Sequence, residues 1–349
     1  MSSQPTIEGT RAPVVHRRAR RALLACALSA AALALGAAGA SASSFLPPSR
    51  QVFQGVAGQP ISTYEQLAGK HPSVYEIFSA WGEYLPGMFA DAQSAHARLM
   101  LMISTMSGTR EMITPLQIAD GAGDDWLIAM NRAMYASGLV TYVRLMAEMD
   151  AYCNDYSAYG ADGSYRGSAH SQAAYRNAWR RVTLILRGGS LASIDAQLHR
   201  LGMPPLRSSS DLPRPKVAML WVPQTSGDPD IPGNQPSNYW PGRRWVDWVG
   251  TDFYGKFPNF SGLTSFYRAH RGLPFVFGEW ALWGSDNPRF VAQLFGWIGS
   301  HPRVRMLIYN QGVNPDGPLR LSLYPRAASE LRRLLANPRF PAFAPEWGG

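Results

Sequence analysis

Two glutamates follow buried, strand-like runs, a placement that suits acid–base chemistry. Residues 139–146 form an apolar run, and Glu148 comes directly after it, before a polar and aromatic loop. A second run of the same kind, residues 273–284, carries Glu279. Carboxylates are seldom buried unless they are paired or functional. The other glutamates outside the first 42 residues fall on predicted helices or loops or, for Glu76, inside a strand. Glu148 and Glu279 are therefore the candidates, and an ion pair with an arginine is the structural alternative for Glu148.

Two carboxyl groups on opposite sides of one cleft suit the cleavage of a glycosidic bond. One protonates the leaving oxygen, and the other attacks the anomeric carbon or activates a water. Sugar rings also need flat platforms, which aromatic side chains supply, although some of the candidates will belong to the core. The aromatic candidates at or just after strand ends are Trp81, Tyr156, Tyr159, Trp221, Trp240, Phe253, Trp280 and Trp283. Asp252 and Asn310, also near strand ends, complete the predicted substrate-binding set.

Arg144 and Tyr254 are predicted to support the two acids. Arg144 lies four residues before Glu148, and the period of two in a strand would put both side chains on one face. An arginine there could hold the floor of the site and keep a neighbouring carboxylate ionised. A structural ion pair is the alternative. Tyr254 ends the strand before the one that carries Glu279, so its hydroxyl can reach that carboxylate.

Eight strand-like runs alternate with helical stretches along the chain. Nearly continuous apolar runs of this kind indicate a parallel sheet covered by helices. Eight units favour a single α/β domain, a closed (β/α)8 TIM barrel, over an open doubly wound sheet. In such a barrel the chemistry sits at the C-terminal ends of the strands. The predicted strands are residues 52–57, 73–80, 97–104, 139–146, 216–222, 245–254, 274–277 and 304–309.

The predicted helices begin with recognisable signals. Ser62, with Glu65 three residues later, has the capping-box pattern for a helix over residues 62–69. Thr114-Pro115 puts a proline at the first position of another helix. The remaining helices are expected over residues 86–95, 124–137, 168–187, 190–201, 263–271, 287–300 and 325–335.

The first 42 residues are predicted to be a secretory signal peptide. Residues 17–21 hold four arginines, residues 22–38 are apolar, and Ala40-Ser41-Ala42 fits a cleavage site. A retained anchor is the alternative, but the apolar run is short for a spanning helix. We predict a secreted protein without a stable membrane anchor, exported by either the general or the twin-arginine route. The expected division is signal peptide 1–42, leader 43–50, catalytic barrel 51–340 and C-terminal tail 341–349.

Composition argues against several other classes. The net charge is +9 for the whole chain and +5 without residues 1–42, which hold five arginines and one glutamate. No basic cluster interleaves with aromatics, so no nucleic-acid partner is expected. The histidines are scattered without metal-ligand spacing, Asp228 and Asp230 are expected to form a solvated turn rather than a calcium site, and no phosphate loop occurs. Cys153 is the one cysteine beyond the signal peptide and is expected to pack as a small apolar residue. We predict a monomer without metal or cofactor.

Several motifs, in chain order, resemble glycoside hydrolase family 26, the clan A family that contains β-mannanases. The string Arg144-Leu-Met-Ala-Glu148-Met-Asp-Ala-Tyr resembles its strand-4 acid/base motif. Residues 240–254 resemble its loop and sixth strand, residues 274–279 its nucleophile strand, and residues 113–124 the segment before strand 4. The similarity runs over about residues 52–335. The motifs are weak one by one, and their order makes the resemblance specific.

The resemblance implies a retaining glycosidase with Glu148 as acid and base and Glu279 as nucleophile. Tyr254 would donate a hydrogen bond to the nucleophile, and Arg144 would be the family's strand-4 arginine. The chain departs from the family at Ala147, where His is usual, and at two following positions. Those two are Asp150, where the family has Asn, and Ala151, where it has Gly.

The expectation is therefore a secreted glycosidase that cleaves β-glycosidic bonds of an extracellular polysaccharide, β-mannan or another β-glycan. The lost histidine removes a sugar contact, and Asp150 adds a negative charge near the acid. These departures motivate the alternative, a non-catalytic carbohydrate-binding or cell-wall interaction protein on the same barrel.

Overall fold

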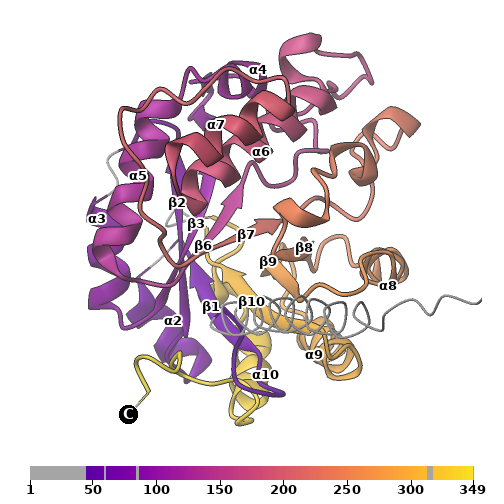
Figure 1. Cartoon of the computed structure of the whole chain (residues 1–349). Coiled ribbons are helices and arrows are strands. Elements are labelled where there is room, and N and C mark those ends of the chain that lie inside the picture. The colour runs from indigo at the N-terminus through magenta and orange to yellow at the C-terminus, as the bar shows by residue number, and fades with distance from the viewer. Residues whose placement is uncertain (1–44, 59, 84–85, 313–316, 349) are drawn as a thin grey trace, which may run out of the picture. The chain divides into compact units, whose positions relative to one another are not determined.

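Eight parallel strands close into a barrel, as the alternation of apolar runs and helices predicted. The computed structural model describes residues 45–58, 60–83, 86–312 and 317–348. Around the barrel the strands follow the order β1-β10-β9-β8-β7-β6-β3-β2, with every neighbouring pair parallel (Figure 1). All eight predicted strands are present, so the predicted α/β class and TIM barrel are confirmed. The strands are β1 (Phe53–Ala57), β2 (Val74–Ala80), β3 (Arg98–Ser104), β6 (Thr141–Leu145), β7 (Val217–Trp221), β8 (Trp248–Tyr254), β9 (Phe275–Ala281) and β10 (Val304–Asn310).

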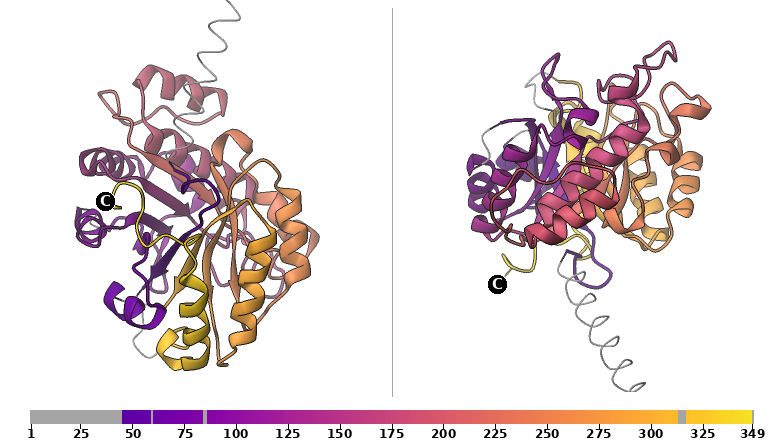
Figure 2. Two further views of the ribbon diagram at one scale, coloured as in Figure 1. Left: turned by 90° about the horizontal axis from the view of Figure 1, so that it is seen from below. Right: turned by 45° about the horizontal axis from the view of Figure 1, so that its top comes forward.

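Helices surround the strands on the outside of the barrel (Figures 1 and 2). They are α2 (Ile61–Ala68), α3 (Pro86–Ser94), α4 (Pro115–Ala119), α5 (Asp124–Ser137), α6 (Gln172–Arg187), α7 (Leu191–Arg200), α8 (Phe260–Ala269), α9 (Pro288–Ser300) and α10 (Pro325–Leu335). Short 3-10 turns are η1 (Ser168–His170), η2 (Pro232–Asn234), η3 (Pro236–Tyr239), η4 (Arg243–Trp245) and η5 (Leu321–Leu323). A small hairpin pairs β4 (Met106–Ser107) with β5 (Arg110–Glu111) after β3.

The helix start predicted at Thr114 is present, whereas the one predicted at Ser62 is not. Thr114 caps α4: its hydroxyl accepts from the Gln117 N–H at 3.2 Å, while the Gln117 side chain accepts from the Thr114 N–H at 2.9 Å. The capping box predicted at Ser62 is wrong. The cap of α2 is Pro60, and Ser62 lies inside the first turn. A residue at the N-cap has non-helical backbone angles, whereas Ser62 is already part of the helix, so its side chain does not serve as the cap.

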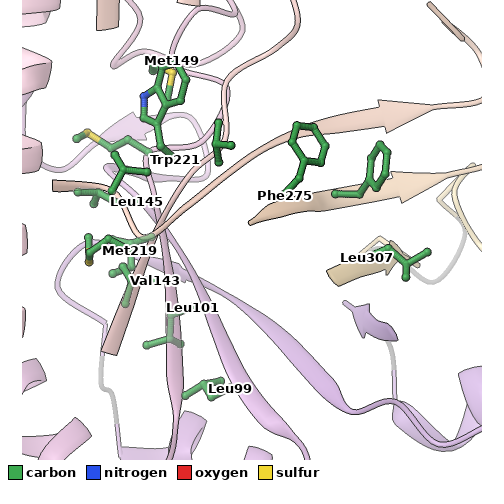
Figure 3. Packing of buried hydrophobic residues seen from close by; sticks show 14 of the residues in the cluster. Leu99, Leu101, Val143, Leu145, Met149, Met219, Trp221, Phe275 and Leu307 are labelled. Atoms are coloured by element: carbon green, nitrogen blue, oxygen red, sulfur yellow. The ribbon is translucent and has the colours of Figure 1, made fainter. Parts of the chain in front are cut away.

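The outward faces of the strands pack against the helices and form the main apolar core. Leu99 and Leu101 of β3 and Val143 and Leu145 of β6 belong to this cluster at every second position (Figure 3). The residues between them face the inside of the barrel, because successive strand residues point to opposite faces. Arg144 is thereby directed inward between two outward-facing apolar residues. Polar chemistry can thus lie inside the barrel while the helix side stays apolar.

The stretch predicted as a C-terminal tail covers the N-terminal ends of two strands. Glu346 accepts from Arg98 Nε at the start of β3 at 2.7 Å. The Phe343 ring stacks on His71 just before β2, with ring centroids 4.4 Å apart. This stretch therefore packs on the face opposite the strand ends that carry the candidate site. The predicted signal peptide lies outside the described residues. Within those residues, no helix combines the length and apolar character that crossing a bilayer requires.

Candidate active site

Arg144 gathers three carboxyl groups inside the barrel. Its Nη1 donates to Glu279 Oε1 at 2.5 Å and to Glu76 Oε1 at 3.0 Å, and its Nη2 donates to Asp252 Oδ2. The side chains of Arg144, Glu76 and Asp252 are each at most 1 % exposed. Burial disfavours the charge of Arg144, but the three carboxyl groups outweigh it and raise its pKa well above the usual value. The guanidinium therefore stays charged and fixes these groups relative to one another.

A bulge in β9 turns Glu279 toward Arg144. Phe277 pairs with Leu307 of β10, yet the next outward residue of β9, Trp280, pairs with Tyr309, so β9 has one extra residue there. The pairing with β8 shows the same shift. Strict alternation after Phe277 would have pointed Glu279 outward, and a bulge re-aims a side chain in this way. The extra residue is therefore what delivers the carboxylate to the inside.

Gly278 makes room for the guanidinium beside this bulge. A Cβ at this position would lie 2.7 Å from Arg144 Nε and 2.9 Å from Asp252 Oδ1. Both distances are shorter than real carbon contacts allow, so a larger residue would displace the ion-pair network. The glycine next to Glu279 is thus required by close approach of a side chain.

The second oxygen of Glu279 is held by neutral donors. The Tyr254 hydroxyl and Asn310 Nδ2 both donate to Oε2, the latter at 2.5 Å. Asp252 Oδ1 accepts from the backbone N–H of Glu279 at 2.7 Å. Tyr254 therefore makes the contact with Glu279 that the sequence led us to expect. Asn310 and Asp252, expected to bind substrate, bond the side chain and the backbone of Glu279, and each also lines a cavity.

Glu148 is placed by a turn and not by strand alternation. The strand β6 ends at Leu145, and Met146 and Glu148 both adopt left-handed backbone conformations, with φ of 42° and 50°. The Glu148 N–H donates to the Val222 carbonyl just past β7 at 2.8 Å. The prediction that a period of two relates Glu148 to Arg144 is therefore wrong. Non-glycine residues with positive φ are strained and need surrounding support, and such residues cluster at functional sites.

The environments of Glu148 and Glu279 push their pKa values in opposite directions. Burial, followed by the charge of Glu279, raises the pKa of Glu148 to about 7, against a smaller opposing effect of Arg144. Burial would also raise the pKa of Glu279, but Arg144 and the hydrogen bond from Tyr254 outweigh it and lower that pKa below its usual value. At neutral pH the first carboxyl retains much of its proton, and the second is ionised. This is the arrangement expected of an acid and a nucleophile.

Glu76 and Gln224 are site residues that the sequence analysis missed. Glu76 was set aside because it lies inside a strand, yet it faces inward from β2 onto Arg144. Burial raises the pKa of Glu76 to about 8, which Arg144 opposes and Glu279 reinforces, so this carboxyl is mainly neutral at pH 7. Gln224, after β7, lines a cavity together with Glu148, and its side chain opposes the rise of the Glu148 pKa. The alternation of inward-facing and outward-facing residues along the strand could have indicated Glu76, whereas no local sequence pattern marks Gln224.

Two cavities lie at the C-terminal ends of the strands, and one of them is lined by Glu148. The acid-side cavity, about 430 Å³, is lined by Glu148, Gln224, Asp252 and Tyr254 among others. The strand-2 cavity, about 570 Å³, lies at the ends of β2, β3 and β10. Its lining includes Phe78, Met102, Met106 and Asn310. Each cavity is lined by a residue that bonds Glu279 Oε2, Tyr254 in the acid-side cavity and Asn310 in the strand-2 cavity.

Four of the aromatic residues expected to bind substrate belong to the core instead. Trp221 packs on Phe266 of α8, and Trp280 packs on Phe295 of α9, because both face outward from their strands. Tyr156 is fully buried and donates to the Ala147 carbonyl at 2.7 Å, which supports the turn before Glu148. Trp81 is 6 % exposed and packs against the tilted ring of Trp126. The corrected residues are Trp81, Tyr156, Trp221 and Trp280.

Trp283 and Trp240 are half-buried and differ in their surroundings. The Trp283 ring meets the Tyr254 ring edge to face with centroids 5.7 Å apart, and Lys256 Nζ lies 4.7 Å from its centroid. This places Trp283 beside a residue that contacts Glu279. Trp240 packs against Trp221 at 4.8 Å, on the helix side of the barrel. Trp283 is therefore the stronger candidate for a sugar platform. Among the described residues, no group of three or more His, Cys, Asp or Glu is placed to hold a metal ion.

Comparison with known proteins identifies the fold. No family model and no curated protein sequence matches this chain. Among solved structures it is similar to the Bacillus subtilis mannanase BCman, with a TM-score of 0.55 and 13% identity over 86% of this chain and 90% of that one. For a GH26 β-mannanase from Bacteroides ovatus the TM-score is 0.54 and the identity 14%, over 83% of this chain and 90% of that one. For a modular Cellulomonas fimi endo-β-1,4-mannanase the TM-score is 0.55 and the identity 12%, over 83% of this chain and 71% of that one. At these identities the likeness concerns the fold alone: this chain is folded as the barrel of the glycoside hydrolase family 26 mannanases.

Proposed function

We propose that this protein is a secreted, retaining glycoside hydrolase that cleaves β-glycosidic bonds of an extracellular polysaccharide, β-mannan or another β-glycan. Secretion rests on the predicted signal peptide. The mannan assignment rests on the likeness of the barrel to solved mannanases. The observation that carries the proposal is the opposite shift of two neighbouring carboxyl pKa values, upward for Glu148 and downward for Glu279.

In the first step Glu148 donates its proton to the glycosidic oxygen while Glu279 attacks the anomeric carbon. The leaving sugar carries the proton away, and a glycosyl ester forms on Glu279. Arg144, Tyr254 and Asn310 hold the attacking carboxylate in one orientation, so it needs no reorganisation before attack. The negative charge of Glu279 disappears in the ester, which removes the main electrostatic reason for the raised pKa of Glu148.

In the second step Glu148, now a carboxylate, takes a proton from water as the water attacks the anomeric carbon. The ester bond to Glu279 breaks, and the sugar is released with its original anomeric configuration. The same residue serves as acid and then as base because ester formation on Glu279 lowers its proton affinity.

The test is an assay of hydrolysis on a panel of β-mannans, β-glucans and related polysaccharides, in which the release of reducing ends is measured. We expect Glu148→Ala and Glu279→Ala to abolish activity, whereas Glu330→Gln, which removes a surface carboxylate of α10, is the matched control and retains it. Proton NMR of the first product should show the substrate's anomer, and the opposite anomer would contradict the retaining mechanism. Azide should restore turnover of a substrate with a good leaving group to Glu148→Ala.

Binding without cleavage is the competing outcome. Wild-type protein that binds a glycan in calorimetry, yet releases no reducing ends from any member of the panel, would establish a carbohydrate-binding protein instead. A monomer in sedimentation experiments is the expected oligomeric state.

A further inference from the structure

Asp150 is a fully buried carboxyl that the proposed mechanism does not use. It lies two residues beyond Glu148, in the turn that follows β6. Its Oδ1 accepts from the backbone N–H of Gln224 at 2.9 Å. The Gln224 side chain acts on the Glu148 carboxyl and opposes the rise of its pKa, and both residues line the acid-side cavity. Asp150 thus holds the backbone of a residue whose side chain acts on the candidate acid.

The backbone of Asp150 fastens the same loop. Its carbonyl accepts from the Asp228 N–H at 2.8 Å and from Asn234 Nδ2 at 2.8 Å. Both partners belong to the loop between β7 and β8, which lines the acid-side cavity. One residue therefore ties the turn that carries Glu148 to the loop that faces it.

Among the residues that the structure describes, no basic side chain forms an ion pair with the Asp150 carboxyl. Its Oδ2 is buried without a hydrogen-bond partner. The titratable groups that face it are all acidic: Glu148 in its own turn, Asp228 in the opposing loop, Tyr175 of α6 and Tyr239 of η3. A buried carboxylate without a counter-charge is strongly unfavourable, so the neutral acid is the form that fits this site.

We propose that Asp150 is a positioning residue for Glu148. As a neutral carboxyl group it holds the backbone of Gln224, and with it the Gln224 side chain, without adding charge beside the acid. Neutrality matters because a second carboxylate would oppose ionisation of Glu148, the state that the second step needs. Burial first, and the nearby carboxylates after it, raise the pKa of Asp150 well above its usual value, in agreement with the geometry. The role of Glu148 in this inference rests on the proposed function. The unfolding experiment does not depend on that function, because it needs no substrate.

Unfolding of Asp150→Asn tests the charge state without any substrate. The unfolded chain ionises Asp150 near its ordinary pKa, whereas the folded protein keeps the proton. Wild-type stability is therefore lost as pH rises from the unfolded pKa toward the raised folded one. Asparagine keeps the acceptor oxygen and has no such dependence. We expect the urea midpoint of Asp150→Asn, relative to wild type, to rise steadily between pH 4 and 7. Asp230→Asn, which removes an exposed carboxyl of the same cavity, is the matched control. If the difference in urea midpoint between Asp150→Asn and wild type does not change with pH, Asp150 is ionised in the folded protein and the proposal is overturned.

Kinetics test the positioning role. Asp150→Asn should retain kcat/KM within about threefold and keep the alkaline limb of the pH profile at the wild-type position. Asp150→Ala, which deletes the acceptor for Gln224, should lose at least tenfold in kcat. An alkaline limb that moves to lower pH in Asp150→Asn would mean that a negative charge had been removed, against the proposal. If wild type cleaves no glycan, the proposed function fails, while the unfolding experiment still decides the state of Asp150.

Discussion

Arg144 Nη1 donates to Glu279 Oε1 at 2.5 Å, which joins β6 to β9 inside the barrel. The same guanidinium serves Glu76 and Asp252, so its removal leaves three buried carboxyl groups without a cation. We expect Arg144→Met to lower the free energy of unfolding by about 3–5 kcal/mol at pH 7, as for other buried pairs that lose one partner. Urea titration measures this. Arg333→Met, which breaks an exposed pair on α10, should leave stability unchanged, and an equal loss in both variants would contradict the role of Arg144.

We expect the pKa of about 7 for Glu148 to set the alkaline limb of the activity profile. The acid must carry its proton, so kcat/KM should fall as pH rises through about 7. On the acid side, activity should fall where Glu279 binds a proton, since the nucleophile must be ionised. Initial rates across pH 4 to 9 measure both limbs.

The charge of Glu279 is one cause of the raised pKa of Glu148, and its removal provides a direct check. In Glu279→Gln, we expect Glu148 to titrate below 7, because the repelling carboxylate has become a neutral amide. Carbon NMR of protein labelled at glutamate side chains follows this titration. If the pKa of Glu148 is unchanged in this variant, the charge of Glu279 does not contribute to its rise and burial alone causes it.

Gly278→Ala should disrupt the network with a single methyl group. The new Cβ would meet Arg144 Nε at 2.7 Å. We expect a stability loss of about 1–3 kcal/mol from overpacking. We also expect a loss of roughly 10²-fold in kcat, because misplacement of a catalytic group by about 1 Å costs that much. Gly296→Ala in the exposed face of α9 is the matched control. It meets no atom within 4 Å and should gain about 0.5–1 kcal/mol.

Trp283 and Trp280 lie three residues apart and should respond differently to truncation. Trp283→Ala removes the half-buried ring beside Tyr254, so we expect KM to rise about tenfold, or ~1.4 kcal/mol, with little change in stability. Trp280→Ala opens a cavity in the core and should cost about 3–5 kcal/mol of stability. Thermal unfolding and steady-state kinetics separate the two. A Trp283→Ala variant with unchanged KM would remove Trp283 from the substrate site.

The eight strands were predictable because buried parallel strands appear in sequence as continuous apolar runs. The same continuity hid which face each residue takes. Trp221 and Trp280 could not be assigned to the helix side, since both faces of their strands are apolar. Glu76 was discounted because it lies inside a strand and not at its end.

The sequence indicates which two carboxyl groups are the candidates, but not the backbone geometry that directs their side chains. Glu148 reaches the site through two left-handed residues, Met146 and Glu148 itself, and neither is a glycine that would have marked the turn. Glu279 depends on an irregularity in strand pairing, which appears only when β8 and β10 are in place. Alternation gave the correct inward face for Arg144, because β6 is regular there.

The extra residue in β9 gives this barrel a vulnerability that substitutions do not reveal. Deletion of one residue between Phe277 and Trp280 would restore regular pairing with both neighbouring strands. The apolar residues on either side would keep their places. If Gly278 were the residue deleted, Glu279 would follow Phe277 directly and still face inward, but without the glycine that makes room for Arg144. If Glu279 were deleted, the shorter chain could fold as well and would lack the proposed nucleophile.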